Sequence, residues 1–187
     1  VQSKTIVIRQ AVSIVTEPKT TYAKFGETLN VEIEASGDGL TYQWYIKNAG
    51  GDKYTKSTIK TDTYTVTMSD KVNGRRIRCI VTDKYGNKVE TKTVVLRMAA
   101  TIVTQPKDVT APKGETVKVT LKAVGTDLTY QWYIKNAGKD KFVKSSVTSA
   151  TYTVKMAKKA DGREIYCVVK DKYGKSVKSD IVTLSMS

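Results

Sequence analysis

The chain has 187 residues, a formal net charge of +14, two cysteines and no histidine. Without histidine it lacks the commonest general base and a common metal ligand, and two cysteines alone make neither a disulfide framework nor a metal site. The positive charge would suit nucleic acid or an anionic glycan, but acidic residues stand between the lysines, as on a solvated surface. We therefore expect no catalytic residues, no metal site and no cofactor.

An internal repeat organises the chain. The string LTYQWYIKNAG occurs unchanged at residues 40–50 and 128–138. The two tryptophans and the two cysteines keep the same spacing of 88 residues, at Trp44, Trp132, Cys79 and Cys167. This period predicts two domains, residues 13–100 and residues 101–187, which align without a gap.

Residues 1–12 repeat the pattern of residues 89–100, so that Val7 corresponds to Val95 and Arg9 to Arg97. The pattern predicts that this segment is the last strand of an upstream repeat, and that the chain is a fragment of a longer array. The alternative is that the segment joins the first domain as an added edge strand.

Each domain then shows short segments of alternating apolar and polar residues, separated by turn residues. In the first domain these segments lie at 14–19, 29–35, 40–47, 64–68, 77–81 and 94–98. Together with the variable stretch that follows Gly50, they predict about seven strands per domain. The fold class that follows is all-β, with two tandem two-sheet sandwiches.

The same alternation separates core positions from surface positions. Trp44 shares its face with Leu40 and Ile46, whereas Tyr45 and Lys47 point the other way. Both cysteines fall on the inward face of a later strand, where an unpaired thiol acts as a small apolar side chain. The predicted structural core therefore includes Trp44, Cys79, Trp132 and Cys167.

These residues resemble the immunoglobulin fold, in which a strand-C tryptophan is followed by a strand-F cysteine in the run Cys-x-Val-x-Asp-x-x-Gly. In detail the chain is similar to the immunoglobulin-like repeats of secreted and surface proteins of Gram-positive bacteria. The similar strings are Gln-Pro-Lys-Asp-Val at 105–109, Tyr-Gln-Trp-Tyr in each copy, and Val-Thr-Asp-Lys-Tyr-Gly-Asn at 81–87.

The chain departs from antibody-type domains at two places. Ile33 and Leu121 stand where the strand-B cysteine would be, so an apolar contact is expected in place of the inter-sheet disulfide. Ile77 and Ile165 stand where the tyrosine of the tyrosine corner would be. The corner hydrogen bond must therefore be absent or made by other groups.

The resemblance places strands C, F and G in one sheet, whose outer face gathers aromatic and basic residues. The candidate binding face consists of Tyr45, Lys47, Arg76, Arg78 and Ile80 in the first domain and Tyr133, Lys135, Glu164, Tyr166 and Val168 in the second. Such residues suit a protein or glycan ligand. The alternative is that they only make cross-strand pairs on a solvated sheet.

The leading interpretation is a non-enzymatic stalk and adhesion module that binds host protein or glycan. We expect it to be extracellular, on a bacterial cell surface or secreted, and joined to neighbouring immunoglobulin-like repeats in the parent chain. The alternative is an accessory module for an anionic glycan or cell-wall polymer, attached to an enzyme elsewhere in the parent chain. We expect neither nucleic-acid binding nor membrane insertion.

Overall fold

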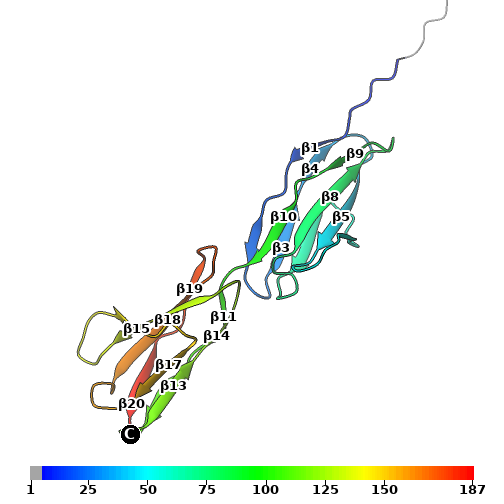
Figure 1. Cartoon of the computed structure of the whole chain (residues 1–187). Coiled ribbons are helices and arrows are strands. Elements are labelled where there is room, and N and C mark those ends of the chain that lie inside the picture. The colour runs from blue at the N-terminus through cyan, green and yellow to red at the C-terminus, as the bar shows by residue number, and fades with distance from the viewer. Residues whose placement is uncertain (1–5) are drawn as a thin grey trace, which may run out of the picture. The chain divides into compact units, whose positions relative to one another are not determined.

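The computed structural model describes residues 6–187, and all its regular structure is β (Figure 1). The chain divides into two compact units, residues 1–97 and residues 98–187. Of the expected strand at 1–12, residues 1–5 lie outside the described residues. Residues 6–12 belong to no strand, and Arg9 places its guanidinium 4.1 Å from the ring centre of Tyr85. The pairing of this segment stays a prediction.

The first unit contains ten short strands, three more than expected: the segment 29–35 forms two strands, β3 and β4, and the strands β2 and β9 lie outside the expected segments. Their bounds are β1 Ser13–Thr16, β2 Thr21–Ala23, β3 Thr28–Glu32, β4 Glu34–Ser36, β5 Thr41–Lys47, β6 Thr55–Lys56, β7 Thr63–Thr67, β8 Arg76–Thr82, β9 Lys88–Glu90 and β10 Val94–Met98.

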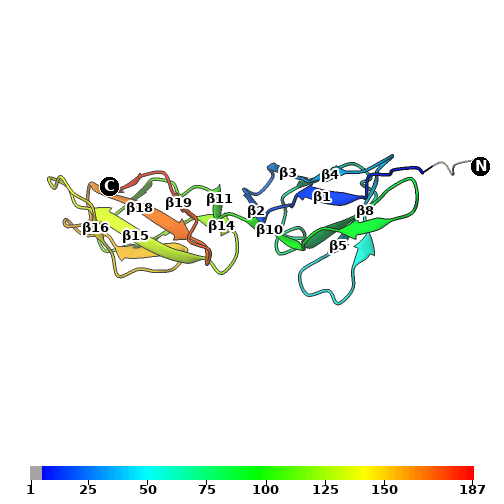
Figure 2. The same ribbon diagram turned by 90° about the horizontal axis from the view of Figure 1, so that it is seen from above.

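Two layers form the sandwich of the first unit (Figure 2). In one layer β1 pairs with β4, and β3 pairs with β7. In the other the strand order is β2-β10-β8-β5-β6, with β9 also on β8. Strand β2 follows the expected first strand and β9 precedes the expected last strand, so that the first and last strands each consist of two pieces with a break between them. This is the strand arrangement of an immunoglobulin-like sandwich.

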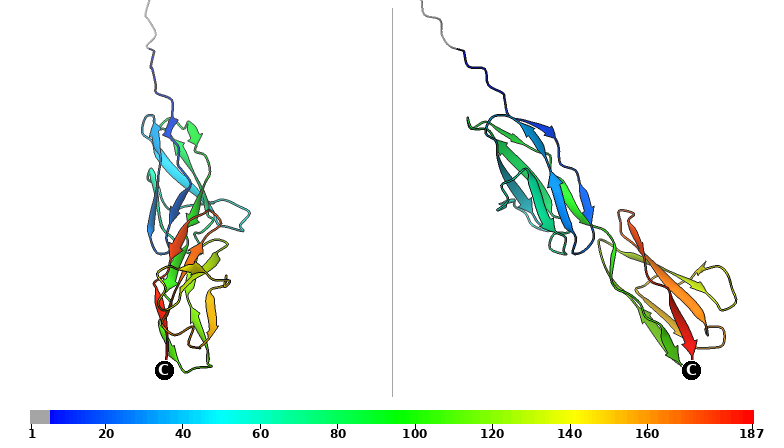
Figure 3. Two further views of the ribbon diagram at one scale, coloured as in Figure 1. Left: turned by 90° about the vertical axis from the view of Figure 1, so that its left-hand side faces the viewer. Right: turned by 180° about the vertical axis from the view of Figure 1, so that it is seen from behind.

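The second unit repeats this arrangement strand for strand. Figure 3 shows that it too is built of strands without a helix. Its layers are β11–β14 with β13–β17, and the sheet β12-β20-β18-β15-β16 with β19 on β18. The bounds are β11 Thr101–Thr104, β12 Val109–Ala111, β13 Thr116–Thr120, β14 Lys122–Val124, β15 Thr129–Lys135, β16 Val143–Lys144, β17 Thr151–Lys155, β18 Arg163–Lys170, β19 Ser176–Lys178 and β20 Val182–Met186.

The core of each unit lies between the two layers and is centred on its tryptophan. Trp44 is 0% exposed, and its ring centre lies 5.5 Å from that of Tyr64 on the opposite layer. Its indole Nε1 donates a hydrogen bond to the carbonyl oxygen of Thr61 (2.9 Å), so the one polar atom of the ring is satisfied. Trp132 makes the equivalent contacts with Tyr152 and Ser149.

Both cysteines are buried and unpaired. Cys79 lies directly across from Trp44 in the β5–β8 register, and Ile33 is buried at the break between β3 and β4. Burial raises the pKa of the Cys79 and Cys167 thiols to about 11, so both are protonated at neutral pH. A protonated thiol in an apolar core is chemically inert.

An arginine two residues before the position of the missing corner tyrosine bonds across the two layers. Arg75, just before β8, donates from Nη1 to the hydroxyl of Tyr64 on β7 (3.0 Å) and from Nε to Oδ1 of Asn48 (2.8 Å). In the second unit Arg163, 8% exposed, makes the same bonds to Tyr152 and Asn136. Each arginine ties the two layers together and also holds the loop after the tryptophan strand.

An aspartate closes the turn between β8 and β9. Asp83 accepts hydrogen bonds at Oδ1 from the backbone N–H groups of Tyr85 and Asn87, and at Oδ2 from the Asn87 side chain (2.8–2.9 Å). Burial by itself would raise the pKa of this carboxyl, but the hydrogen bonds from Asn87, Tyr85 and Gly86 outweigh it and lower the pKa below its ordinary value.

Replacing either thiol tests the assignment of the cysteines. We expect Cys79→Ala and Cys167→Ala each to keep the fold and to lower the free energy of unfolding by about 1–2 kcal/mol, because each change removes one small buried side chain. Chemical denaturation followed by tryptophan fluorescence measures this. A reductant should leave the melting temperature of the wild type unchanged, and a decrease would reveal a disulfide.

Acid titration tests the turn aspartate. Since the folded-state pKa of Asp83 is lowered, its contribution to stability is present above the unfolded-state pKa of about 3.9 and is lost as the pH falls through the folded-state value. We expect Asp83→Asn to have a lower free energy of unfolding than the wild type at pH 7, and the difference to shrink below about pH 4. Asp70→Asn, an exposed aspartate outside the turn, controls for the loss of one charge. A stability difference that stays constant from pH 7 to pH 3 would contradict this assignment.

Candidate functional site

Residues 6–187 contain no group of three or more His, Cys, Asp or Glu side chains that could hold a metal ion. The same residues contain no helix that is long and apolar enough to cross a membrane. The candidate binding residues named from the sequence lie on one face of the larger sheet of each unit.

We use the name CFG face for the outward side of β5, β8 and β9 in the first unit and of β15, β18 and β19 in the second. The β5–β8 register places Tyr45 opposite Arg78, Lys47 opposite Arg76, and Gln43 opposite Ile80. The second unit places Tyr133 opposite Tyr166, Lys135 opposite Glu164, and Gln131 opposite Val168. In each unit the candidate residues therefore share one side of one sheet.

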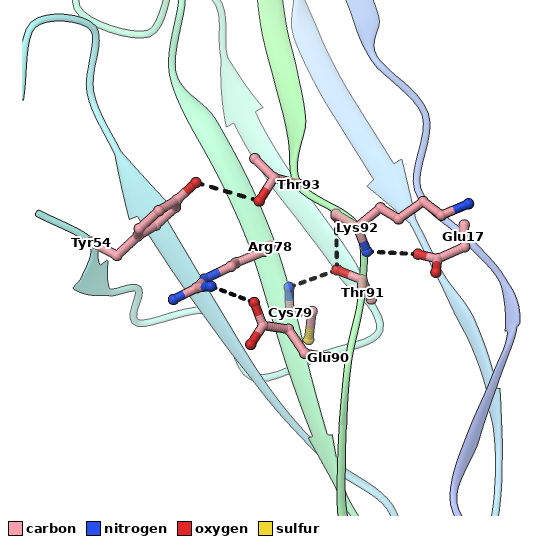
Figure 4. A network of polar contacts seen from close by, with 8 residues as sticks. All are labelled: Glu17, Tyr54, Arg78, Cys79, Glu90, Thr91, Lys92 and Thr93. Atoms are coloured by element: carbon pink, nitrogen blue, oxygen red, sulfur yellow. Dashed lines mark hydrogen bonds and ion pairs between the residues drawn. The ribbon is translucent and has the colours of Figure 1, made fainter.

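Arg78 is the centre of the CFG face in the first unit (Figure 4). Its guanidinium carbon lies 4.4 Å from the ring centre of Tyr54 and 6.0 Å from that of Tyr45, and Nη1 forms an ion pair with Glu90 of β9. The Tyr54 hydroxyl lies 3.4 Å from the Thr93 hydroxyl. The ammonium nitrogen of Lys47 lies 5.4 Å from the centre of the same Tyr54 ring. Arginine stacked on aromatic rings is well suited to binding because its side chain is already ordered.

In the second unit aromatic rings occupy the equivalent positions of the CFG face. Tyr133 and Tyr166 stack with ring centres 5.0 Å apart and an interplanar angle of 11°, and Phe142 packs edge-on against Tyr166 at 4.8 Å. The ammonium group of Lys178 lies 4.0 Å from the centre of the Tyr166 ring. Burial, with the neighbouring Tyr133 as a second cause, raises the pKa of Tyr166, so its hydroxyl is neutral at physiological pH.

Lys135 completes this cluster on the side away from Lys178. Its ammonium group lies 2.9 Å from the Glu164 carboxylate and 5.2 Å from the ring centre of Phe142. The Glu164 charge is therefore paired with a neighbour on the adjacent strand. Such pairs between partly exposed groups contribute little to stability, about 0–1 kcal/mol.

A hollow opens on the CFG face of the second unit beside this cluster. It has a volume of about 430 Å³ and is lined by Thr129, Tyr130, Gln131, Tyr133, Lys144, Val168 and Lys170. A second hollow of about 470 Å³ is formed by the loop between β15 and β16 and the adjoining strand ends, and is lined by Ile134, Asn136, Lys139, Asp140, Lys141 and Val143. Only the first is walled by residues of the candidate face.

Sequence reasoning missed four residues of these clusters: Tyr54, Glu90, Phe142 and Lys178. Tyr54 and Phe142 lie in the stretch where the two copies differ most, yet each copy has an aromatic residue at that position. That shared aromatic was the available signal. Glu90 and Lys178 precede the break in the last strand, and only the pairing of β9 with β8 and of β19 with β18 places them beside the rings.

That break is held by a buried hydroxyl. The Thr91 hydroxyl accepts a hydrogen bond from the backbone N–H of Cys79 (2.9 Å) and donates one to the carbonyl oxygen of Lys92 (3.1 Å) (Figure 4). Ser179 does the same for Cys167 in the second unit. The hydroxyl accepts a hydrogen bond from a backbone N–H group at the break, where no strand backbone pairs with it. This bond fixes the position of β9 or β19 on the CFG face.

A scan against protein-family models and a search of curated proteins each found no match. Solved structures do match. The structure of extracellular domains 3–5 of Drosophila OTK aligns with a TM-score of 0.55 at 16% identity, over 96% of this chain and 63% of that one.

The N-terminal four immunoglobulin domains of Dscam1 align in two isoforms. Isoform 7.44 gives a TM-score of 0.60 at 16% identity, over 98% of this chain and 48% of that one. Isoform 9.44 aligns with a TM-score of 0.60 at 16% identity, over 97% of this chain and 47% of that one. The chain thus spans less than two thirds of the length of each of these structures, and identities this low bear on the fold alone. The chain has the all-β fold of two tandem immunoglobulin-like domains.

Proposed function

We propose that the chain is a non-enzymatic adhesion module, in which two immunoglobulin-like domains act as part of a stalk and present a ligand-binding CFG face. The observation that carries this proposal is the pair of ordered clusters of aromatic and cationic side chains around Arg78 and Tyr166. Both clusters stand on the outward side of the sheet, where the core does not need them.

These side chains are held in place by their neighbours, which supports a binding role. Tyrosine and arginine dominate the binding energy of protein interfaces, and a side chain that is already held by neighbours loses less entropy when a ligand binds. Tyr45, Arg78, Tyr133 and Tyr166 are all half-buried, so each keeps part of its surface available to solvent. The proposed ligand is a protein or a glycan.

The non-enzymatic assignment rests on the side chains present. The chain has no histidine, and both thiols are buried with a pKa of about 11. A nucleophilic cysteine needs an exposed and activated thiolate, which neither position offers.

The setting we propose is extracellular, on the surface of a Gram-positive bacterium or secreted from it. The support is the similarity of the strings at 81–87 and 105–109 to repeats of such proteins. The structure of Drosophila OTK is described as that of extracellular domains, which is consistent with this setting. The domains we propose are residues 13–100 and residues 101–187, from the period of 88 residues. The similarity of residues 1–12 to residues 89–100 supports the proposal of neighbouring repeats in the parent chain.

A binding screen tests the proposal. The wild type and a variant with Tyr45→Ala, Arg78→Ala, Tyr133→Ala and Tyr166→Ala are applied to arrays of extracellular proteins and glycans. We expect a ligand for the wild type whose binding falls at least about tenfold in the variant, because its anchoring side chains are gone.

The matched control carries four outward changes on the other layer of each unit: Asn30→Ala, Thr65→Ala, Lys118→Ala and Thr153→Ala. It removes the same single positive charge and should bind like the wild type. Circular dichroism and the melting temperature establish that all three proteins are folded. A ligand that still binds the variant with the four CFG-face changes would overturn the proposed binding face. If the wild type binds no protein or glycan on the arrays, the adhesion proposal fails and a role as a spacer is what is left.

A further inference from the structure

The hollow on the CFG face of the second unit has a distinctive chemistry. Its lining contains Lys144 and Lys170, the phenol of Tyr133, and the apolar side chain of Val168, and it contains no acidic residue. Lys178 adds a third ammonium group on the same face, since it lies across from Val168 on the neighbouring strand. The three lysines come from β16, β18 and β19 and are all exposed.

A hydrogen-bond acceptor stands among these cations. The side-chain nitrogen of Gln131 donates to the carbonyl oxygens of Trp132 (2.9 Å) and Ser145 (2.7 Å), which fixes the amide in place. Within residues 6–187, Oε1 of Gln131 receives no hydrogen bond. A fixed acceptor of this kind suits a ligand that carries hydroxyl donors.

The first unit lacks this combination. Thr82 and Glu90 occupy the positions of Lys170 and Lys178, and Glu90 pairs with Arg78. Oε1 of the equivalent Gln43 is already occupied, because Lys60 donates to it. Within residues 6–187 the two units share a core and a backbone, yet the second presents three lysines without an ion-pair partner around an unoccupied acceptor, and the ammonium group of Lys178 lies against the Tyr166 ring.

We propose that the hollow of the second unit binds an anionic polysaccharide. Hydroxyl groups of the sugar donate to Oε1 of Gln131, its apolar ring face packs on Tyr133 and Val168, and its carboxylate or sulfate groups meet Lys144, Lys170 and Lys178. The volume of about 430 Å³ lies in the usual range for ligand sites. This inference rests on the proposed function and assigns its ligand class and its place.

A sugar polymer fits these groups better than a purely charged ligand. A polyanion without hydrogen-bond donors would use the lysines but leave the Gln131 acceptor unpaired. The net charge also favours the second unit, since residues 101–187 carry 16 basic and 8 acidic side chains, against 14 and 10 in residues 13–100.

The chain supplies its own test variant. Lys170→Thr with Lys178→Glu gives the second unit the residues of the first, which the first unit shows to be compatible with this backbone. Lys118→Thr with Lys155→Glu makes the same change of charge on the outward side of β13 and β17. Any effect of net charge alone is therefore equal in the two variants.

Binding is measured by isothermal titration with chondroitin sulfate at two salt concentrations, with neutral dextran and polyphosphate as comparison probes. We expect the wild type to bind chondroitin sulfate, and the Lys170/Lys178 variant to lose about tenfold in affinity, as the loss of two ion pairs implies. The Lys118/Lys155 variant should stay within about twofold of the wild type. Gln131→Met, which removes the acceptor without adding a charge, should weaken chondroitin sulfate binding more than polyphosphate binding.

Equal losses in the two lysine variants, equal affinity for polyphosphate, or absence of chondroitin sulfate binding would each overturn this inference. The failure of the proposed function looks different. If the array yields a neutral glycan or a protein whose binding depends on Tyr45, Arg78, Tyr133 and Tyr166, the adhesion proposal stands and only the anionic site falls. If the array yields nothing and chondroitin sulfate does not bind, both fall.

Discussion

The pairing of the tryptophan strand with the cysteine strand is the constraint on which both the core and the candidate face depend. In the first unit this register sets Trp44 against Cys79 on the inside and, one residue on, Tyr45 against Arg78 on the outside. Because side chains alternate along a strand, a slip by one residue would exchange these two sets completely. The burial of Trp44 therefore fixes the position of the binding candidates as well.

Polar groups then hold the rest of the sandwich to this pair of strands. Arg75 reaches from the start of β8 to Tyr64 on the other layer, and Asp83 closes the turn at the end of β8. Thr91 joins the broken last strand to the backbone of Cys79. Each bond satisfies a group that would otherwise be buried without a partner, so none of the three side chains can be exchanged for an apolar one at no cost.

The two units show how one scaffold can carry different surfaces. Their cores are nearly the same, but the ion pair of Arg78 with Glu90 in the first unit is replaced in the second by Tyr166 stacked between Tyr133 and Lys178. Outward positions tolerate such exchanges because they do not enter the packed interior. The difference in charge around the hollow follows from these few outward residues.

The sequence by itself determined the all-β class, the duplication and the core, because alternation with period two and the repeated Trp44 and Cys79 depend only on local order along the chain. The tertiary structure alone decided the rest. It brought Tyr54 and Phe142 from a divergent loop onto the CFG face, and Glu90 and Lys178 from the broken last strand. These contacts join distant segments through sheet pairing, whose partners and register no short stretch of sequence specifies.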